Sequence, residues 1–194
     1  MGTALVVGGK KSCDVLVALV RENGYLEITP AFSGGEARRA LAEKEFELVL
    51  INTPLSDEFG ADLALRAARA SVTGVMLFVR GDQADEVSAK VEECGVFVVE
   101  KPLSRQIFHQ AVRLVGTARR RMLALERENI KLQTKMEEIR LVCRAKCILM
   151  ASLGMTEDQA HHHIEKQAMD LRVTRREIAQ GILKSDEGTR DHGE

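Results

Sequence analysis

The residues nearest to a catalytic pattern lie close to the N-terminus, in the run Gly8-Gly9-Lys10-Lys11-Ser12. Such a run could cradle a phosphate, because backbone amides and an ammonium group both bind phosphate oxygens. The nucleotide-hydrolysing loop has the pattern GxxxxGK[ST], in which the final hydroxyl binds magnesium. If Gly9 and Lys10 form the GK pair, Lys11 replaces the hydroxyl residue and Ala4 replaces the first glycine. We therefore exclude nucleotide hydrolysis, and since no other nucleophile and base are paired in the sequence, we predict that the protein is not an enzyme.

The cysteines and histidines do not have the spacing of a metal site. Cys13, Cys94, Cys143 and Cys147 contain no CxxC pair, which favours a reducing cytoplasm. Cys143 and Cys147 lie four apart on a predicted helix and would supply half a metal site, but small buried apolar side chains are the favoured interpretation. Successive side chains of the run His161-His162-His163 point roughly 100° apart on a helix and cannot converge on one ion. We predict no metal and no other cofactor.

The charges are distributed unevenly along the chain. Residues 1–104 contain 11 Lys and Arg against 16 Asp and Glu, whereas residues 105–184 contain 16 against 9. The basic second part favours a polyanionic partner, although a solvated helix surface would give the same count. Residues 185–194 are polar and are predicted to be a disordered tail. Apolar runs stay below the roughly 18 residues of a membrane helix and no signal pattern is present, so we expect a cytoplasmic protein without a membrane partner.

The first hundred residues alternate short apolar runs with amphipathic segments. Buried strands are predicted at 4–7, 26–29, 48–51, 75–79 and 96–99, and helices near 11–23, 34–43, 58–71 and 83–93. Nearly continuous apolar strands that alternate with helices indicate a parallel sheet covered on both faces. We predict an α/β fold for residues 1–117, a flavodoxin-like doubly wound five-stranded parallel sheet.

This domain resembles the receiver domains of response regulators in its strand pattern, its length and the Lys101-Pro102 pair after the fifth strand. In a receiver, two acids hold Mg²⁺, an aspartate accepts the phosphoryl group, and a hydroxyl residue and a lysine detect the new charge. The resemblance places these roles at Gly8, Gly9, Asn52, Val79 and Lys101. Only the lysine keeps the receiver's residue type, since glycine offers magnesium no carboxylate and an amide forms no acyl phosphate.

We therefore predict a pseudo-receiver with a degenerate phosphorylation pocket, in which Lys101 pairs with a carboxylate such as Glu100. Such a domain would bind a partner protein or a second copy of itself, with a small ligand as the alternative.

A helical period begins at Ser104 and continues for some fifty residues. Its heptad frame predicts a coiled-coil dimerisation helix over residues 105–143, continuous with the last receiver helix. The predicted dimer seam consists of Phe108, Val115, Met122, Leu125, Asn129, Leu132, Met136 and Ile139. One buried asparagine at a core position, here Asn129, favours a parallel dimer in fixed register. An intramolecular helix hairpin is the alternative partner for this seam.

Two short helices are predicted after Gly154, which ends the long helix. The runs Thr156-Glu157-Asp158-Gln159 and Thr174-Arg175-Arg176-Glu177 both have the spacing of a capping box. We predict helices over 157–171 and 175–183 that form a small three-helix bundle with the end of the long helix. The predicted core stripe of the first of these two helices is Ala160, Ile164, Ala168 and Leu171.

Residues 140–184 resemble the ANTAR domain, the RNA-binding module of bacterial transcription antiterminators. The resemblance rests on Ala145 with Ile148-Leu149-Met150, on Ala160-His161 with Ala168-Met169-Asp170, and on Arg175-Arg176-Glu177-Ile178-Ala179. The residues predicted to bind RNA are Arg144, Lys146, His161, Lys166, Arg172, Arg175, Arg176, Gln180 and Lys184. Guanidinium groups pair with phosphates and stack on unpaired bases. Since no Phe, Tyr or Trp follows Phe108, this module must contact bases through arginines, imidazoles or hydrogen bonds.

The whole arrangement resembles antitermination regulators of two-component signal transduction. The resemblance implies a homodimer that binds hairpins in a nascent leader transcript and prevents a terminator from forming. With no phosphate acceptor, we expect control by a regulatory protein partner or constitutive binding. A DNA-binding response regulator is an alternative, because two helices joined by a tight turn also describe a helix-turn-helix. A protein-interaction scaffold is a further alternative, and it predicts a shallow salt dependence of binding.

Overall fold

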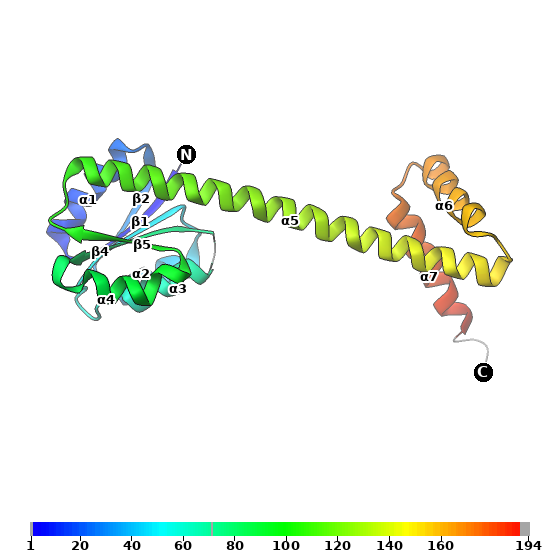
Figure 1. Ribbon diagram of the computed structural model, residues 1–194, viewed down its shortest axis with the longest axis horizontal. Helices are drawn as coiled ribbons and strands as arrows, with labels where there is room; N and C mark the ends of the chain where they lie inside the picture. The colour runs from blue at the N-terminus through cyan, green and yellow to red at the C-terminus, as the bar shows by residue number, and fades with distance from the viewer. Residues whose placement is uncertain (1, 71, 191–194) are drawn as a thin grey trace. The chain divides into compact units, whose positions relative to one another are not determined.

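The computed structural model describes residues 2–70 and 72–190, which divide into two compact units (Figure 1). The first unit spans residues 1–125 and the second spans residues 126–194. Helix α5, Arg105–Leu153, contributes its first part to the one unit and its remainder to the other. Among the described helices, none combines the length and the apolar character that crossing a membrane requires.

The first unit is built on a parallel sheet of five strands. These are β1 Gly2–Val7, β2 Tyr25–Ala31, β3 Leu48–Asn52, β4 Gly74–Arg80 and β5 Val96–Lys101. Their order is β2-β1-β3-β4-β5 and every neighbouring pair is parallel, which confirms the predicted flavodoxin-like sheet. Because all strands run the same way, the residues that follow β1, β3, β4 and β5 meet at one edge of the sheet.

Helices cover both faces of this sheet. They are α1 Lys10–Glu22, α2 Gly34–Glu43, α3 Ala61–Ala70 and α4 Gly81–Val91, with a short 3-10 turn at Glu92–Cys94. One core lies between the sheet and α2, α3 and α4, and the other lies between the sheet, α1 and the start of α5 (Figure 1). Strand residues alternate between the two cores, since Leu5 and Val7 face one and Ala4 and Val6 face the other.

The second unit contains the end of α5 together with α6, Glu157–Leu171, and α7, Arg175–Arg190. Both predicted helix starts are confirmed. The hydroxyl of Thr156 accepts from the amide of Gln159 while the Gln159 side chain accepts from the Thr156 amide, and Thr174 and Glu177 exchange the same two bonds. Gly154 ends α5 with φ +64°, a left-handed conformation that glycine adopts without steric cost.

Two predictions for this unit are wrong. Helix α7 continues past residue 183, so residues 185–190 are helical instead of disordered, while residues 191–194 lie outside the described residues. The helix continues because Leu183 extends the buried stripe and the Ser185 hydroxyl donates to the Gly181 carbonyl at 3.0 Å. Leu171, predicted to be in the core, is 66% exposed because the chain turns away directly after it.

Candidate functional site

The edge at which the strands of the first unit end brings three of the predicted pocket residues together. The ammonium group of Lys101, at the end of β5, donates to the side-chain oxygen of Asn52 at 3.1 Å and to the carbonyl of Thr53. A Cβ on Gly8 would lie 3.1 Å from the Asn52 Cβ, so the first glycine is also in contact with this site. Gly9 precedes the first turn of α1, and Val79 is fully buried in β4.

This pocket has no carboxylate at any of the five predicted positions. Burial lowers the pKa of Lys101, and the positive charge of Arg80 lowers it further. The predicted pairing of Lys101 with Glu100 is wrong, because both hydrogen-bond acceptors found for the ammonium in the described chain are neutral oxygens. Asn52 and Thr53 supply them because β3 ends there, at the same edge of the sheet as the end of β5, whereas Glu100 is exposed. The pocket therefore offers one cation and an amide where magnesium chemistry needs acids.

The loop between β3 and α3 is held against α2, a feature that sequence reasoning missed. The Asp57 carboxylate accepts from the amides of Gly34 and Gly35 at 2.8 and 3.0 Å, and these bonds lower its pKa. Glu58 pairs with Arg38 at 2.6 Å. Glycines at the start of a helix followed by acids in a later loop are a weak signal, because only the fold shows that the two meet. The loop next to the pocket is thus fixed to the N-terminus of α2.

The first three turns of α5 belong to the core of the first unit. The ring of Phe108 is fully buried and stacks on Phe78 with a centroid distance of 6.1 Å, and Val115 lies in the same core. The prediction that Phe108 and Val115 belong to the dimer seam is therefore wrong. The apolar period of α5 continues through this region, but here the sheet is the surface that it covers.

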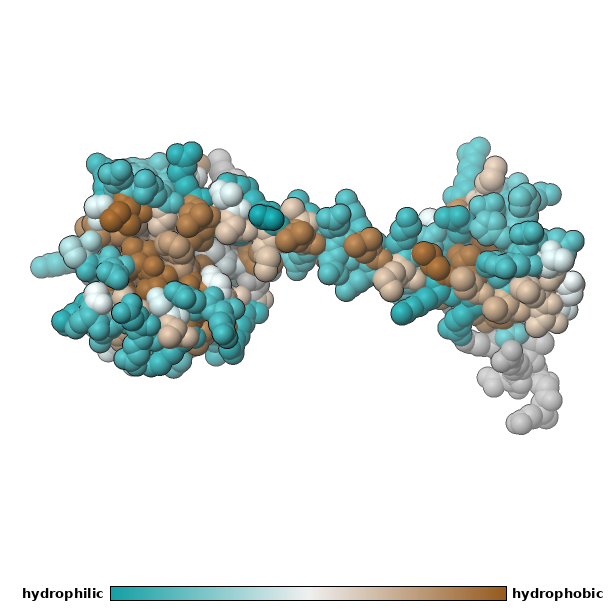
Figure 2. All heavy atoms as spheres, viewed as in Figure 1, coloured by the Kyte–Doolittle hydropathy of each residue, from teal (hydrophilic) through white to brown (hydrophobic). Residues whose placement is uncertain are grey.

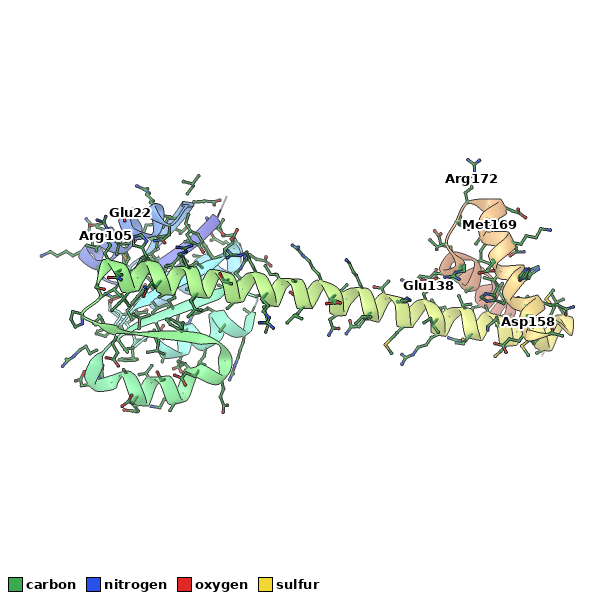
Figure 3. All side chains as sticks on the ribbon, turned by 45° about the horizontal axis from the view of Figure 1, so that its top comes forward. Glu22, Arg105, Glu138, Asp158, Met169 and Arg172 are labelled. Atoms are coloured by element: carbon green, nitrogen blue, oxygen red, sulfur yellow. The ribbon has the colours of Figure 1, made fainter. Side chains whose placement is uncertain are left out.

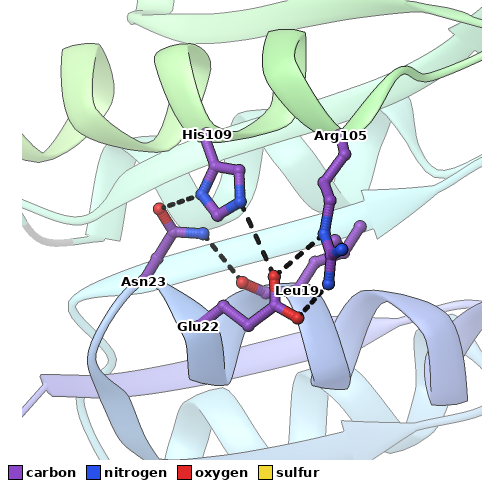
Figure 4. A network of polar contacts seen from close by, with 5 residues as sticks. All are labelled: Leu19, Glu22, Asn23, Arg105 and His109. Carbon is purple, nitrogen blue, oxygen red and sulfur yellow. Dashed lines mark hydrogen bonds and ion pairs between the residues drawn. The ribbon is translucent and has the colours of Figure 1, made fainter.

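A polar network joins this part of α5 to the end of α1 (Figure 4). Two nitrogens of the Arg105 guanidinium contact the Glu22 carboxylate. One is Nε, which donates at 3.1 Å, and the other is the terminal nitrogen Nη2. His109 places Nδ1 3.0 Å from the Asn23 side-chain oxygen and Nε2 3.6 Å from Glu22. The side-chain amide of Asn23 donates to the Leu19 carbonyl at 2.7 Å. The network fixes the first turns of α5 to the end of α1.

Beyond Val115 the remaining seam positions are exposed. The five apolar ones are 54–59% exposed, and Asn129 is exposed as well. The apolar positions are Met122, Leu125, Leu132, Met136 and Ile139. Figure 2 shows hydrophobic side chains on the surface along the middle of α5. No described helix covers these positions, so the predicted alternative of an intramolecular hairpin has no partner helix in this structure. We call these six residues the exposed stripe.

In the second unit α5 packs on α6 and α7 through a different face. Leu141, Val142, Ala145 and Leu149 of α5 form a core with Ala160, Ile164, Ala168, Ile178 and Ala179. Cys143 and Cys147, predicted to be small buried side chains, are exposed because they lie outside this packed face. In the part of the chain that the structure describes, no group of three or more His, Cys, Asp or Glu side chains could hold a metal.

Four of the predicted RNA-binding residues are engaged by carboxylates of the same unit. Arg176 pairs with Glu137 at 3.1 Å, and Arg175 pairs with Glu138 at 3.4 Å and with Glu165 at 3.5 Å. Lys146 pairs with Glu157 at 2.7 Å, which raises the pKa of Lys146 and lowers the pKa of Glu157. The imidazole of His161 lies 3.3 Å from Glu165. These contacts join α5, α6 and α7, and they neutralise much of the predicted basic surface.

The other five predicted residues are exposed and have no hydrogen bond or ion pair with another described side chain. They are Arg144, Lys166, Arg172, Gln180 and Lys184. Arg172 projects outward at the end of α6 (Figure 3). The structure therefore separates the predicted set into charged groups that are already paired and a group that is free to meet an anion.

Comparison with known proteins supports both units. Residues 131–183 match the family model of the ANTAR domain. The chain is 29% identical over 170 residues to the transcriptional regulatory protein PdtaR of Mycobacterium tuberculosis. The aligned residues cover 88% of this chain and 83% of PdtaR.

Solved structures match the first unit. A receiver domain from Clostridium thermocellum matches with a TM-score of 0.56 at 16% identity, over 63% of this chain and 99% of that domain. A CheY-like receiver from Methanospirillum hungatei JF-1 matches with a TM-score of 0.57 at 18% identity, over 63% and 98%. At these identities the solved structures establish the fold alone.

The chain thus has the receiver fold at its N-terminus, followed by a long helix and shorter helices. It carries an ANTAR domain at residues 131–183, which begins earlier in α5 than the predicted residue 140. The predicted resemblance of the first unit to the receiver fold and the predicted ANTAR domain are both confirmed.

Proposed function

We propose that this protein is an RNA-binding transcription antitermination regulator. It binds hairpin loops in a nascent leader transcript and prevents a terminator hairpin from forming. The observation that carries the proposal is the ANTAR domain at residues 131–183, together with similarity over most of the chain to a protein named as a transcriptional regulator. The sequence relatives are named as transcriptional regulatory proteins, which favours a regulator over an enzyme.

The RNA surface of this proposal consists of the exposed basic residues that lack a carboxylate partner. Arg144, Lys166, Arg172 and Lys184 each present a full positive charge, whereas Arg176 and Lys146 share theirs with Glu137 and Glu157. Phosphate binding releases counterions only where a free charge meets the backbone. Arg175, Arg176 and Lys146 act in this proposal mainly by holding the three helices together.

The active form of this proposal is a parallel dimer joined through the exposed stripe. Five large apolar side chains at heptad spacing stay more than half exposed in the single chain, which favours burial against a second copy. Asn129 would face its own copy and fix the register. Two linked RNA-binding modules gain avidity of about 10²–10⁴ when both loops can be reached.

The receiver-like unit is in this proposal a pseudo-receiver. Gly8, Gly9 and Asn52 offer no acid for magnesium or for an acyl phosphate. Control then comes from a regulatory protein partner, or binding is constitutive, and phosphorylation of this domain takes no part.

The test is an electrophoretic shift of the full-length protein with an RNA of two stem-loops against duplex DNA of equal length. We expect the RNA to bind at least tenfold more tightly, with an affinity that falls as salt rises. Arg144→Ala with Lys184→Ala should weaken RNA binding, whereas Arg39→Ala with Arg66→Ala removes two exposed charges of the first unit and should not. Tighter binding of the duplex would favour a DNA-binding regulator, and binding of neither nucleic acid would favour a scaffold.

A further inference from the structure

The turn between α6 and α7 holds an arginine in a backbone conformation that usually selects glycine. Arg172 has φ +54°, and the other described residues with positive φ are Gly24, Gly60, Gly95 and Gly154. Its amide donates to the Met169 carbonyl at 3.3 Å, and the next amide, of Val173, donates to the Ala168 carbonyl at 3.0 Å. This pair of bonds is the Schellman helix end, whose left-handed position is ordinarily glycine. An arginine here costs backbone free energy relative to glycine, and residues in such conformations cluster at functional sites.

A pocket of about 340 Å³ lies beside this turn. Its walls are the apolar side chains of Ala168, Met169 and Val173, and its rim is formed by Glu165 and Arg175. The two rim groups are a carboxylate and a guanidinium 3.5 Å apart, which offer an acceptor next to donors. Met169 is 77% exposed and lies with Arg172 at the same end of α6 (Figure 3). The site therefore combines a flat apolar contact with a paired acceptor and donor.

We propose that this pocket binds one unpaired nucleobase of an RNA loop, with Arg172 on the adjoining phosphate. The inference rests on the proposed RNA-binding function and adds a base-recognising site to it. A nucleobase has apolar faces and a polar edge, and RNA loops present such bases unstacked. The apolar wall takes the face, while Glu165 accepts from an amino group and Arg175 donates to a carbonyl or ring nitrogen.

The surrounding charge favours RNA over a protein segment as the occupant. Arg172 and Lys166 are exposed and have no carboxylate partner in the described part of the chain, so the same end of α6 offers two unpaired cations, with the exposed carboxylate of Asp170 between them in sequence. No Phe, Tyr or Trp follows Phe108, so this domain lacks the large aromatic side chains on which bases usually stack, and an apolar wall at an exposed turn takes their place. A polyanion with flat apolar groups matches both properties.

The test uses full-length protein and a two-stem-loop RNA whose loops are randomised and then selected for binding. In the selected RNA, each loop nucleotide is replaced in turn by an abasic one. We expect one position at which loss of the base weakens wild-type binding by about five- to 150-fold, the range that contact with one base provides. Met169→Ala should weaken binding of the intact RNA and make the affinity insensitive to loss of the base at that position.

Two variants control this measurement. Leu171→Ala removes another largely exposed apolar side chain from the same turn, outside the pocket lining, and should behave as wild type. Arg172→Gly suits the left-handed backbone, so the protein should melt no lower than wild type while its RNA affinity falls. Glu165→Gln should change which base is selected at the sensitive position.

The outcomes are distinguishable. If wild type selects no RNA, the proposed function fails and the pocket assignment fails with it. If wild type binds RNA but Met169→Ala keeps the full sensitivity to the abasic nucleotide, only the pocket assignment is overturned. The same holds if Arg172→Gly binds the selected RNA as tightly as wild type.

Discussion

The ammonium group of Lys101 lies 3.1 Å from the side-chain oxygen of Asn52, so the lysine contacts an amide at the position that the sequence predicts for the phosphate acceptor. An aspartate here would carry a charge that the lysine could pair with, and phosphorylation would change that charge. The amide is neutral and chemically inert towards phosphoryl donors. In the pseudo-receiver proposed above, this contact therefore does not respond to an upstream signal that acts by phosphorylation.

We expect no phosphorylation of this unit. Incubation with acetyl phosphate and Mg²⁺ should leave the intact mass unchanged, because Asn52 forms no acyl phosphate and Gly8 and Gly9 bind no magnesium. Asn52→Asp alone should also remain unmodified, since the acids that hold the metal are still missing. A mass increase of one phosphoryl group in the wild type would contradict this prediction.

Phe108→Ala should destabilise the first unit by about 3–5 kcal/mol, the usual cost of removing a fully buried ring. The reason is its stacking on Phe78 in the core between the sheet and α5. Denaturant unfolding measures the change. Ile107→Ala is the matched control, because the neighbouring side chain is 50% exposed and its loss should change stability by no more than about 0.5 kcal/mol. Equal effects of the two variants would show that α5 does not pack on the sheet in this way.

Leu132→Lys with Ile139→Lys should convert the protein to a monomer, because two charges in the exposed stripe would face their own copies. Sedimentation equilibrium measures the mass in solution. Ile130→Lys places a charge on an equally exposed residue of the same helix outside the stripe, and this variant should remain dimeric. A wild-type mass of one chain at micromolar concentration would contradict the predicted dimer.

Asp57→Asn should lower the melting temperature at neutral pH, because the charged carboxylate holds the first amides of α2. The folded-state pKa of Asp57 lies below its unfolded value. The contribution of Asp57 to the free energy of unfolding is therefore complete above its unfolded-state pKa and is lost as the pH falls through its folded-state pKa. The difference between wild type and variant should shrink in acid and vanish once Asp57 is protonated. Asp85→Asn, at an exposed residue with no hydrogen-bond partner in the described chain, is the control and should leave the melting temperature at neutral pH unchanged.

Removal of Arg144 should reduce the salt dependence of RNA binding more than removal of Arg176. A free phosphate contact contributes a slope of about 0.7–0.9 in log affinity against log salt, whereas Arg176 is already paired with Glu137. Titrations of Arg144→Ala and Arg176→Ala at several salt concentrations measure the two slopes. A larger change for Arg176→Ala would mean that the Glu137 pair opens when RNA binds.

Local features of this protein could be predicted from the sequence because they depend on residues close together in the chain. Thr156 with Gln159 and Thr174 with Glu177 start helices where the spacing predicted, since each bond spans three residues. The alternation of apolar runs predicted the sheet because a strand buried on both faces must be apolar throughout. The ANTAR residues were recognised for the same reason, as they follow one another within a short segment.

The tertiary structure alone decided which surface each apolar or charged side chain meets. Phe108 and Met122 have the same place in the heptad period, but the sheet buries the first and leaves the second exposed. The sequence predicts that Arg176 binds RNA, but in the structure it pairs at 3.1 Å with Glu137, which is far from it in sequence. Periodicity specifies that a helix has an apolar face or a charged face. It contains no information on the partner, because the partner is set by contacts between residues that the chain separates and the fold brings together.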